Sequence, residues 1–106
     1  MILLYKDAKP IRVLPGLTRR TLAEGKSMMS CEFTFDAHVT VPIHSHPHEQ
    51  VGYIVEGRVE MSIDGEKFEL RKGDTYAAPP NVPHGAYTLE PAVIVDTFCP
   101  PREEYR

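Results

Sequence analysis

The sequence has no long apolar run and no basic cluster, and both absences narrow its possible partners. No hydrophobic stretch approaches the roughly 20 residues of a membrane span, and residues 1–7 are too short for the hydrophobic core of a signal peptide. Lysine and arginine never occur in a run longer than two, and the formal net charge is −3. This composition argues against a nucleic-acid or polybasic membrane surface. We therefore expect a cytoplasmic protein that binds neither.

The sequence is also poor in cysteine. Its two cysteines, Cys31 and Cys99, are too few for a disulfide framework and lack the C-x-x-C spacing of a redox or zinc motif. Cys31 shares its alternation phase with the apolar residues Met29, Phe33 and Phe35. We therefore expect Cys31 to be a small residue of the core, and we assign Cys99 no role.

Helical periodicity is scarce, whereas alternation with a period of two is frequent. Ten prolines interrupt the chain too often for long helices, and only residues 102–106 are loosely compatible with one. Residues 27–35 and 59–63 alternate between apolar and polar as half-buried strands do. Asp64-Gly65 then predicts a type I′ hairpin turn, after which Phe68 and Leu70 resume the alternation. The 106 residues therefore predict one all-β domain, a sandwich or barrel, with an N-terminal arm over about residues 1–10.

Four of the five histidines gather in two short segments. His44 and His46 are two residues apart, so in an extended chain their side chains point to the same side. Gln50 has the same parity and joins them if the strand resumes after Pro47. His84 follows a proline-rich turn at residues 79–83, which limits its orientation. Three imidazoles and an amide oxygen predict a site for one divalent metal ion with open coordination positions, and they suit zinc, nickel, iron, manganese and cobalt alike.

Two neighbours compete with Gln50 as the fourth ligand. Glu49 carries a charge and is chemically the better donor, but its parity directs it away from His46. His48 has the right parity, although Pro47 disturbs the alternation just before it. His38 stands alone in the sequence, so we interpret it as a surface or turn residue.

These residues resemble the two conserved motifs of the cupin superfamily. The first motif is His-x-His, three or four residues, Glu or Gln, six residues and Gly, and it is carried here by His44, His46, Gln50 and Gly57. The second is Gly, five residues, Pro, x, Asn or Gly, two residues and His, and it is carried here by Gly73, Pro79, Asn81 and His84. The match spans about residues 40–90. The resemblance implies a single-domain cupin β-barrel, also called a jelly roll or double-stranded β-helix, in which the replacement of the usual Glu by Gln leaves the metal ion a stronger Lewis acid.

The end of the chain has a second, narrower resemblance. Residues 84–86 and 95–105 resemble the pectin-degradation KdgF group of small cupins. Members of this group open 4,5-unsaturated monouronates and tautomerise them to linear keto-uronates at a metal site of three His and one Gln. Their terminal motif contributes an Asp, a Phe and an Arg to the active site. The resemblance carries these roles onto Asp96, Phe98 and Arg102.

The residue types suit that reaction on chemical grounds as well. Ring opening leaves an enol that must be protonated at carbon, and Asp96 is the candidate for moving the protons. Arg102 can hold a carboxylate in a bidentate fork, and Phe98 shares the parity of Asp96 and would form a wall of the same pocket. Tyr53 and Tyr76 are candidate hydroxyl contacts to the substrate.

Each of these residues also has a purely structural interpretation. Asp96 would be a solvated carboxylate, although an Asp between apolar strand residues is unexpected without a partner. Arg102 would form a surface ion pair with Glu103 or Glu104. Phe98 would be a core residue.

Three functions are therefore open. The first is an isomerase-type enzyme that opens a small anionic sugar. The second is an iron-dependent dioxygenase, which would leave the motif of Asp96 and Arg102 unexplained, and the third is a non-catalytic module that binds a metal or a sugar. Residues 92–99 are apolar on both faces, so we also expect a homodimer in which one of these faces meets a partner.

Overall fold

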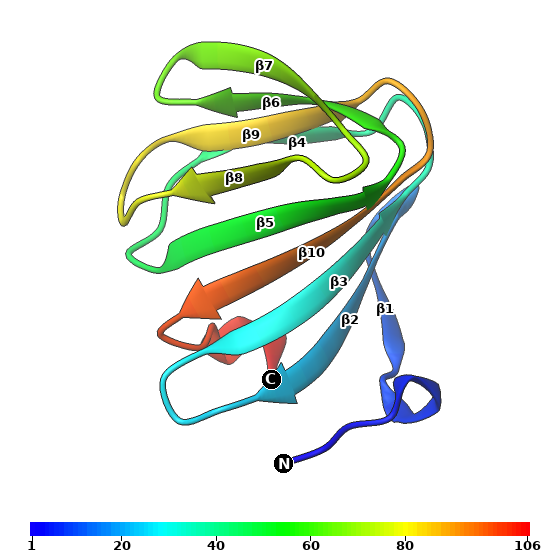
Figure 1. Ribbon diagram of the computed structural model, residues 1–106, viewed down its shortest axis with the longest axis vertical. Helices are drawn as coiled ribbons and strands as arrows, with labels where there is room; N and C mark the ends of the chain where they lie inside the picture. Colours follow the sequence, from blue (N-terminus) through cyan, green and yellow to red (C-terminus); the bar gives the residue numbers. More distant parts are fainter.

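The computed structural model describes all 106 residues and consists mostly of β-strands (Figure 1). Ten strands follow one another along the chain: β1 (Pro10–Leu14), β2 (Leu17–Glu24), β3 (Met29–Phe35), β4 (Thr40–His44), β5 (Glu49–Glu56), β6 (Arg58–Ile63), β7 (Glu66–Arg71), β8 (Thr75–Ala78), β9 (His84–Thr88) and β10 (Ala92–Cys99). They form two antiparallel sheets, with the orders β1-β2-β3-β10-β5-β8 and β4-β9-β6-β7. This arrangement confirms the all-β prediction.

Alternation along the strands places the core between the two sheets. Every second residue of β3, from Met29 to Phe35, is buried, and β10 repeats the pattern from Ala92 to Phe98. These apolar side chains belong to one hydrophobic cluster, in which Cys31 is fully buried as its alternation phase predicts. Asp96 is the exception in β10, because it places a carboxylate on the buried face of the strand.

The Asp64-Gly65 turn joins β6 to β7 as predicted. Asp64 and Gly65 have φ angles of 50° and 81°, the positive values that a type I′ turn requires. Pairing then runs in register from Ile63 opposite Glu66 to Arg58 opposite Arg71. The local sequence therefore determines this hairpin.

The N-terminal arm is anchored on the chain's own six-stranded sheet from Tyr5 onward. A short 3₁₀ helix spans Tyr5–Asp7. The Tyr5 hydroxyl donates to Glu32 at 2.8 Å, and the Arg20 guanidinium lies 4.7 Å from the Tyr5 ring centre. None of the helices in the structure has the length and apolar character needed to span a membrane.

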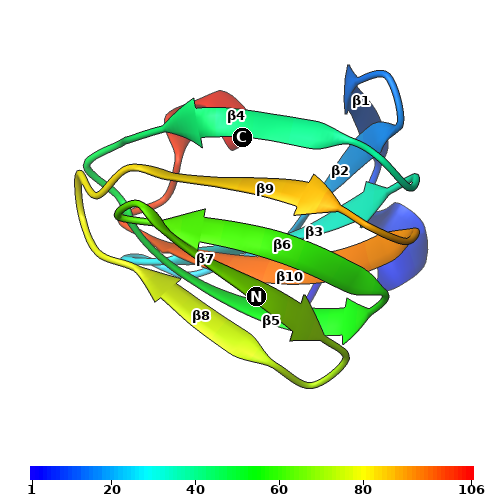
Figure 2. The ribbon, with the colours of Figure 1, turned by 90° about the horizontal axis from the view of Figure 1, so that it is seen from above.

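Residues 100–106, called here the C-terminal segment, return to the space between the sheets. They contain a 3₁₀ helix, Glu103–Tyr105. The Thr21 hydroxyl donates to the Tyr105 carbonyl at 2.6 Å, and Arg106 forms ion pairs with Glu24 and Glu103. Figure 2 shows the segment at the end of the sheets where β4 ends, and Figure 1 shows it next to β10 of the six-stranded sheet. Arg102 and Tyr105 of this segment line the same pocket as His44, the last residue of β4.

Candidate metal centre and pocket

Three histidines meet where β4 ends and β9 begins. His44 is the last residue of β4, His46 lies in the turn that follows, and His84 is the first residue of β9. The two strands are paired so that His44 lies opposite His84. One ring nitrogen of each histidine lies within 4.8 Å of the others. The structure therefore brings together the three histidines that the sequence singles out.

Backbone carbonyls fix the tautomer of all three rings. Each Nδ1 lies 2.8 or 2.9 Å from the carbonyl oxygen of a residue two positions away. Because a carbonyl oxygen only accepts hydrogen bonds, each Nδ1 must carry a proton. In the neutral ring the other nitrogen, Nε2, then has a free electron pair. The cluster therefore presents three electron-pair donors, in the arrangement typical of metal-binding imidazoles.

Burial keeps two of these rings neutral. Desolvation lowers the pKa of His46 and of His84, which favours the uncharged form of each. Nε2 of His84 is buried and has no hydrogen-bond partner. An unpaired polar atom in the interior is costly unless something binds it. A metal ion at the cluster would remove this cost.

Gln50, at the start of β5, completes a set of four neutral donors. Its Nε2 donates to the Tyr76 hydroxyl at 2.9 Å, which turns Oε1 of the amide toward Nε2 of His46 at 3.1 Å. Both of the facing atoms carry electron pairs and neither carries a proton, so they repel unless a cation lies between them. Three imidazoles and one amide oxygen thus fit a divalent transition metal.

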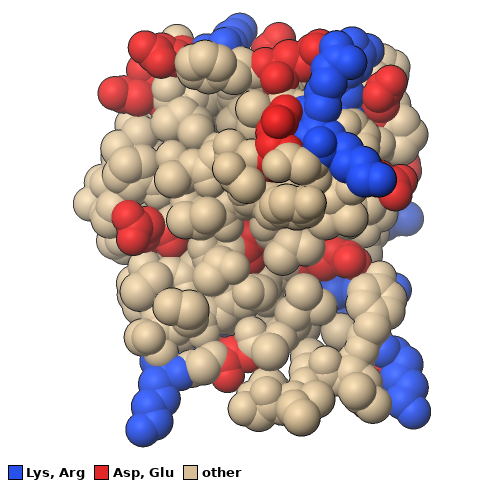
Figure 3. Space-filling view, in the orientation of Figure 1, with Lys and Arg blue, Asp and Glu red and all other residues tan.

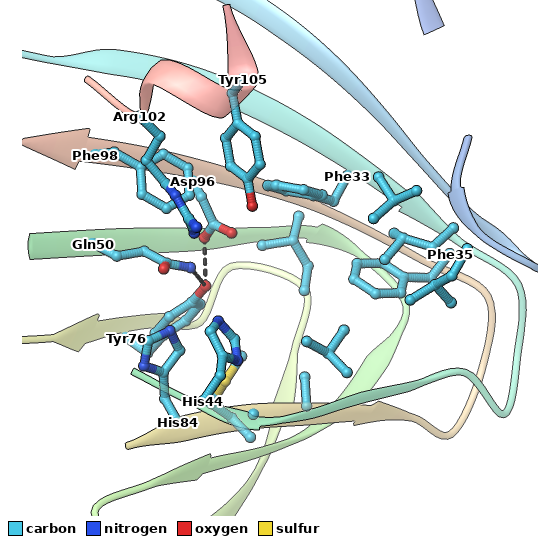
Figure 4. A pocket seen from close by; sticks show the side chains of 18 residues that line it. Phe33, Phe35, His44, Gln50, Tyr76, His84, Asp96, Phe98, Arg102 and Tyr105 are labelled. Atoms are coloured by element: carbon cyan, nitrogen blue, oxygen red, sulfur yellow. Dashed lines mark hydrogen bonds between the residues drawn. The ribbon is translucent and has the colours of Figure 1, made fainter. Parts of the chain in front are cut away.

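Asp96 is connected to Gln50 through Tyr76. The Tyr76 hydroxyl donates to Oδ1 of Asp96 at 2.5 Å while it accepts from the Gln50 amide. Figure 4 shows these side chains in a row between the histidines and the C-terminal segment. A single hydroxyl therefore orients both the amide oxygen of the metal-binding set and the carboxylate.

This row depends on a glycine that sequence reasoning missed. Gly52 lies in β5, directly opposite Tyr76 of β8 and Asp96 of β10. A Cβ atom at Gly52 would lie 2.1 Å from the Tyr76 ring and 2.4 Å from Oδ1 of Asp96. Tyr76 and Asp96 thus meet over the place where a side chain would be. A glycine inside a strand pattern often marks such a close approach, and that signal was available in the sequence.

Asp96 is only 5% exposed, and burial controls its ionisation. Desolvation raises the pKa of Asp96 from 3.8 to about 7, although the hydrogen bonds from Tyr76 and Gln50 act in the opposite direction. Without a metal ion, both protonation states of this carboxyl are populated near neutral pH. A group of this kind can accept a proton and return it.

The C-terminal segment brings Arg102 into the pocket between two aromatic rings. Its guanidinium lies 4.5 Å from the ring centre of Tyr105 and 5.6 Å from that of Phe98. Nε of Arg102 donates to Glu104 at 2.5 Å. Arg102 therefore forms the ion pair with a neighbouring glutamate that the structural interpretation predicted. It also lines the pocket together with Asp96 and Phe98.

Tyr105 is a further pocket residue that the sequence did not indicate. The guanidinium groups of Arg19 and Arg102 lie 4.3 and 4.5 Å from its ring centre. Burial raises the pKa of Tyr105, so its hydroxyl remains protonated. No local motif announces this placement, because it follows from contacts between the end of the chain and β2.

One sequence-based placement differs from the structure, whereas three others agree with it. Tyr53 is 48% exposed on the outer face of β5, opposite in parity to Gln50, so the prediction that it contacts substrate in this pocket is wrong. Glu49 is exposed and His48 is half-buried, and neither belongs to the histidine cluster. His38 lies in the turn before β4 and pairs with the Tyr87 hydroxyl, as expected for a turn residue.

The pocket beside the histidines has two chemically different parts (Figure 4). Its polar end consists of the side chains of His44, His84, Gln50, Tyr76, Asp96 and Arg102. Its apolar half consists mainly of the side chains of Leu17, Phe33, Phe35, Val41, Met61 and Ala86. Figure 4 shows these hydrogen-bonding and charged side chains at one end of the pocket, with Phe33 and Phe35 toward the other.

Comparisons with known proteins agree with the two sequence motifs. A family model described as "Cupin domain" matches residues 31–98. The pectin degradation protein KdgF of Dickeya dadantii (strain 3937) is 39% identical over 80 residues, which cover 74% of this chain and 72% of that protein.

Two solved structures extend the similarity to nearly the whole chain. KdgF from Halomonas sp. has a TM-score of 0.95 at 32% identity and covers 100% of this chain and 98% of its own. An RmlC-like cupin from Shewanella frigidimarina NCIMB 400 also has a TM-score of 0.95, at 31% identity, over 99% of this chain and 95% of its own.

Proposed function

The chain belongs to the cupin family, and from this premise we propose that it is a metal-dependent enzyme of uronate metabolism. In this proposal it opens 4,5-unsaturated monouronates and tautomerises them to linear keto-uronates. The observation that carries the proposal is that Asp96 and Arg102 line one pocket together with His44 and His84, two of the three clustered histidines. The resemblance of the chain end to the KdgF group and the similarity to two KdgF proteins support it.

Four neutral side chains would hold the metal ion in this proposal: those of His44, His46, Gln50 and His84. When bound, the ion would supply Lewis-acid stabilisation of negative charge that develops on the substrate. Because none of these ligands is anionic, the charge of the ion is left for an anionic substrate to balance. A uronate carboxylate matches that requirement.

Arg102 would bind the substrate carboxylate. Its Nε is occupied by Glu104, while its two terminal nitrogens have no protein partner and can make a bidentate contact. The rings of Phe98 and Tyr105 flank the guanidinium and limit its orientations. The side chain is therefore held ready before the substrate arrives.

Asp96 would move the protons of the reaction. In ring opening, the hemiacetal hydroxyl loses its proton, the bond between the anomeric carbon and the ring oxygen breaks, and the ring oxygen gains a proton to become an enol. In the second step the enol hydroxyl loses its proton, and the carbon at the other end of the double bond gains one. Asp96 faces the pocket and is held by the Tyr76 hydroxyl, so the same carboxyl can serve both transfers.

The test follows the conjugated-alkene absorbance of a 4,5-unsaturated monouronate over time. We expect the metal-loaded protein to accelerate its loss, and we expect chelation or Asp96→Asn to remove most of the acceleration. Asp7→Asn, at an exposed position of the N-terminal arm, is the matched control and should retain it. If the metal-loaded protein gives only the spontaneous rate, the uronate proposal is wrong. Oxygen uptake after addition of Fe(II) would then favour a dioxygenase.

A further inference from the structure

The apolar half of the pocket has no role in the proposed uronate reaction. A monouronate carries oxygen on nearly every carbon, and each hydroxyl that leaves water needs a hydrogen-bond partner. Such partners gather at the polar end, whereas Leu17, Phe35 and Met61 offer none. A sugar acid can therefore bind at the polar end, but the rest of the cavity offers its hydroxyl groups no hydrogen bonds.

The apolar half is continuous with the polar end in one pocket. The lining of this pocket extends to Val13 of β1, a residue that is 43% exposed. The Phe33 and Tyr105 rings lie 6.1 Å apart in an edge-to-face arrangement at the junction of the two parts. An aromatic or cyclohexyl-sized group placed there would be surrounded by apolar side chains and ring faces.

We propose that the same site accepts a second class of substrate, the 2-oxo carboxylic acids that carry an apolar ring, and catalyses their keto–enol tautomerisation. The carboxylate binds Arg102, the reacting carbons lie beside Asp96, and the ring occupies the apolar half. This inference deepens the proposed function and rests on it, because it uses the same carboxylate contact and the same proton-transfer group.

The reaction needs no partner beyond the pocket and water. Toward the enol, Asp96 takes a proton from the carbon next to the carbonyl, the carbon–carbon double bond forms, and the carbonyl oxygen gains a proton. Toward the ketone, the same carbon gains a proton and the enol oxygen loses one. Atoms and electrons balance in both directions, and no oxidant or reductant takes part.

Tautomerisation is tested with phenylpyruvate as the probe. The metal-loaded protein should accelerate the loss of enol absorbance, and Asp96→Asn should reduce the acceleration at least tenfold, whereas Asp7→Asn should leave it unchanged. If the wild-type protein gives the buffer rate, the inference is wrong.

Binding measurements test whether the apolar half holds the ring, independently of the reaction. Phenylpyruvate and pyruvate share the same head group, so the ratio of their dissociation constants isolates the contribution of the ring. We expect phenylpyruvate to bind roughly 10- to 100-fold more tightly to the wild-type protein, as burial of a phenyl group implies. Ala86→Leu fills the apolar half and should bring the ratio close to one, whereas Ala23→Leu, at an exposed position of β2, should preserve it. Equal affinity of the wild-type protein for the two ligands would overturn the inference without any variant.

Outcomes with the two substrates separate this inference from the proposed function. Acceleration of uronate opening alone supports the proposed function and rejects the second substrate class. Acceleration of phenylpyruvate tautomerisation alone supports the second class and rejects the uronate assignment. If neither reaction is accelerated, both are wrong.

Discussion

At the scale of single residues, Tyr76 joins the two functional parts of the pocket. Its hydroxyl accepts a hydrogen bond from Gln50 and donates one to Asp96. The orientation of an amide ligand depends on such outer contacts, because either end of the amide can turn toward a metal. We therefore propose that Tyr76 positions these two groups, in place of the substrate contact that the sequence suggested.

Removal of this hydroxyl should weaken metal binding. In Tyr76→Phe the amide of Gln50 is free to rotate, so we expect the affinity for Zn²⁺ or Ni²⁺ to fall about 10- to 100-fold. Competition with a chromophoric chelator measures the change. Tyr87→Phe, which removes a hydroxyl that contacts His38 away from the cluster, should keep the wild-type affinity. Equal affinities of the two variants would contradict the role of Tyr76.

Asp96 should give the metal-free protein a characteristic dependence of stability on pH. Its pKa is raised in the folded state from 3.8 to about 7, so the folded state favours the protonated form. The stabilising contribution is full below about pH 4 and is lost as pH rises through about 7. The side chain at position 96 cannot ionise in Asp96→Asn, so this variant does not lose stability in this way as pH rises. We therefore expect its free energy of unfolding to increase relative to the wild-type protein between pH 4 and 8, by up to about 4 kcal/mol.

Urea unfolding in the presence of a chelator, repeated over that pH range, measures this difference. The comparison cancels the contributions of His46 and His84, whose lowered pKa values cause stability to fall on acidification in both proteins. A constant difference between Asp96→Asn and the wild-type protein across the range would contradict the assigned burial effect.

At the scale of strands, the site depends on three neighbours, β8, β5 and β10, and on the glycine in the middle one. Gly52→Ala would force its new methyl group against the Tyr76 ring and the Asp96 carboxylate. We expect a loss of about 1–3 kcal/mol in the free energy of unfolding, together with weaker metal binding. Gly25→Ala is the control, because its Cβ would meet nothing closer than a carbonyl oxygen at 3.7 Å. Denaturant titration compares the two, and an equal effect at both positions would refute the close-approach argument.

The parts of the site that are close together in the sequence were predictable, whereas those that join distant strands were not. Parity alone aims His44 and His46 at one point, and parity would also have excluded Tyr53, which is an odd number of residues from Gln50. The contact of Tyr76 with Asp96 requires that β5 lie between β8 and β10, and no local pattern encodes that order. The hydrogen bond between Thr21 and Tyr105 spans 84 residues, so the return of the C-terminal segment was equally inaccessible.

At the scale of the whole molecule, the outer face of the six-stranded sheet has an uncharged centre. Val51, Tyr53 and Val55 of β5 are exposed there, and Val93 and Val95 of β10 are half-buried beside them. Figure 3, in the orientation of Figure 1, shows few charged side chains over the middle of this face. A patch of this kind is typical of a surface that meets another protein, which agrees with the expectation of a homodimer.

We expect the protein to sediment as a dimer and Val51→Asp to sediment as a monomer, because a buried carboxylate without a partner would destabilise the interface. Phe68→Asp is the matched control, since Phe68 is an exposed apolar residue of β7 in the other sheet, and it should remain dimeric. Analytical ultracentrifugation at micromolar concentration makes the comparison. A monomeric wild-type protein would contradict the expectation.

The position of the C-terminal segment has a practical consequence for the handling of the protein. Arg106 is ion-paired to Glu24 and Glu103, only four residues beyond the arginine that lines the pocket. A purification tag fused after Arg106 would pull on this anchored turn, whereas Met1 is exposed at the far end of the arm. Affinity tags and surface immobilisation therefore belong next to Met1, and we expect a tag after Arg106 to weaken binding of the proposed substrate at Arg102.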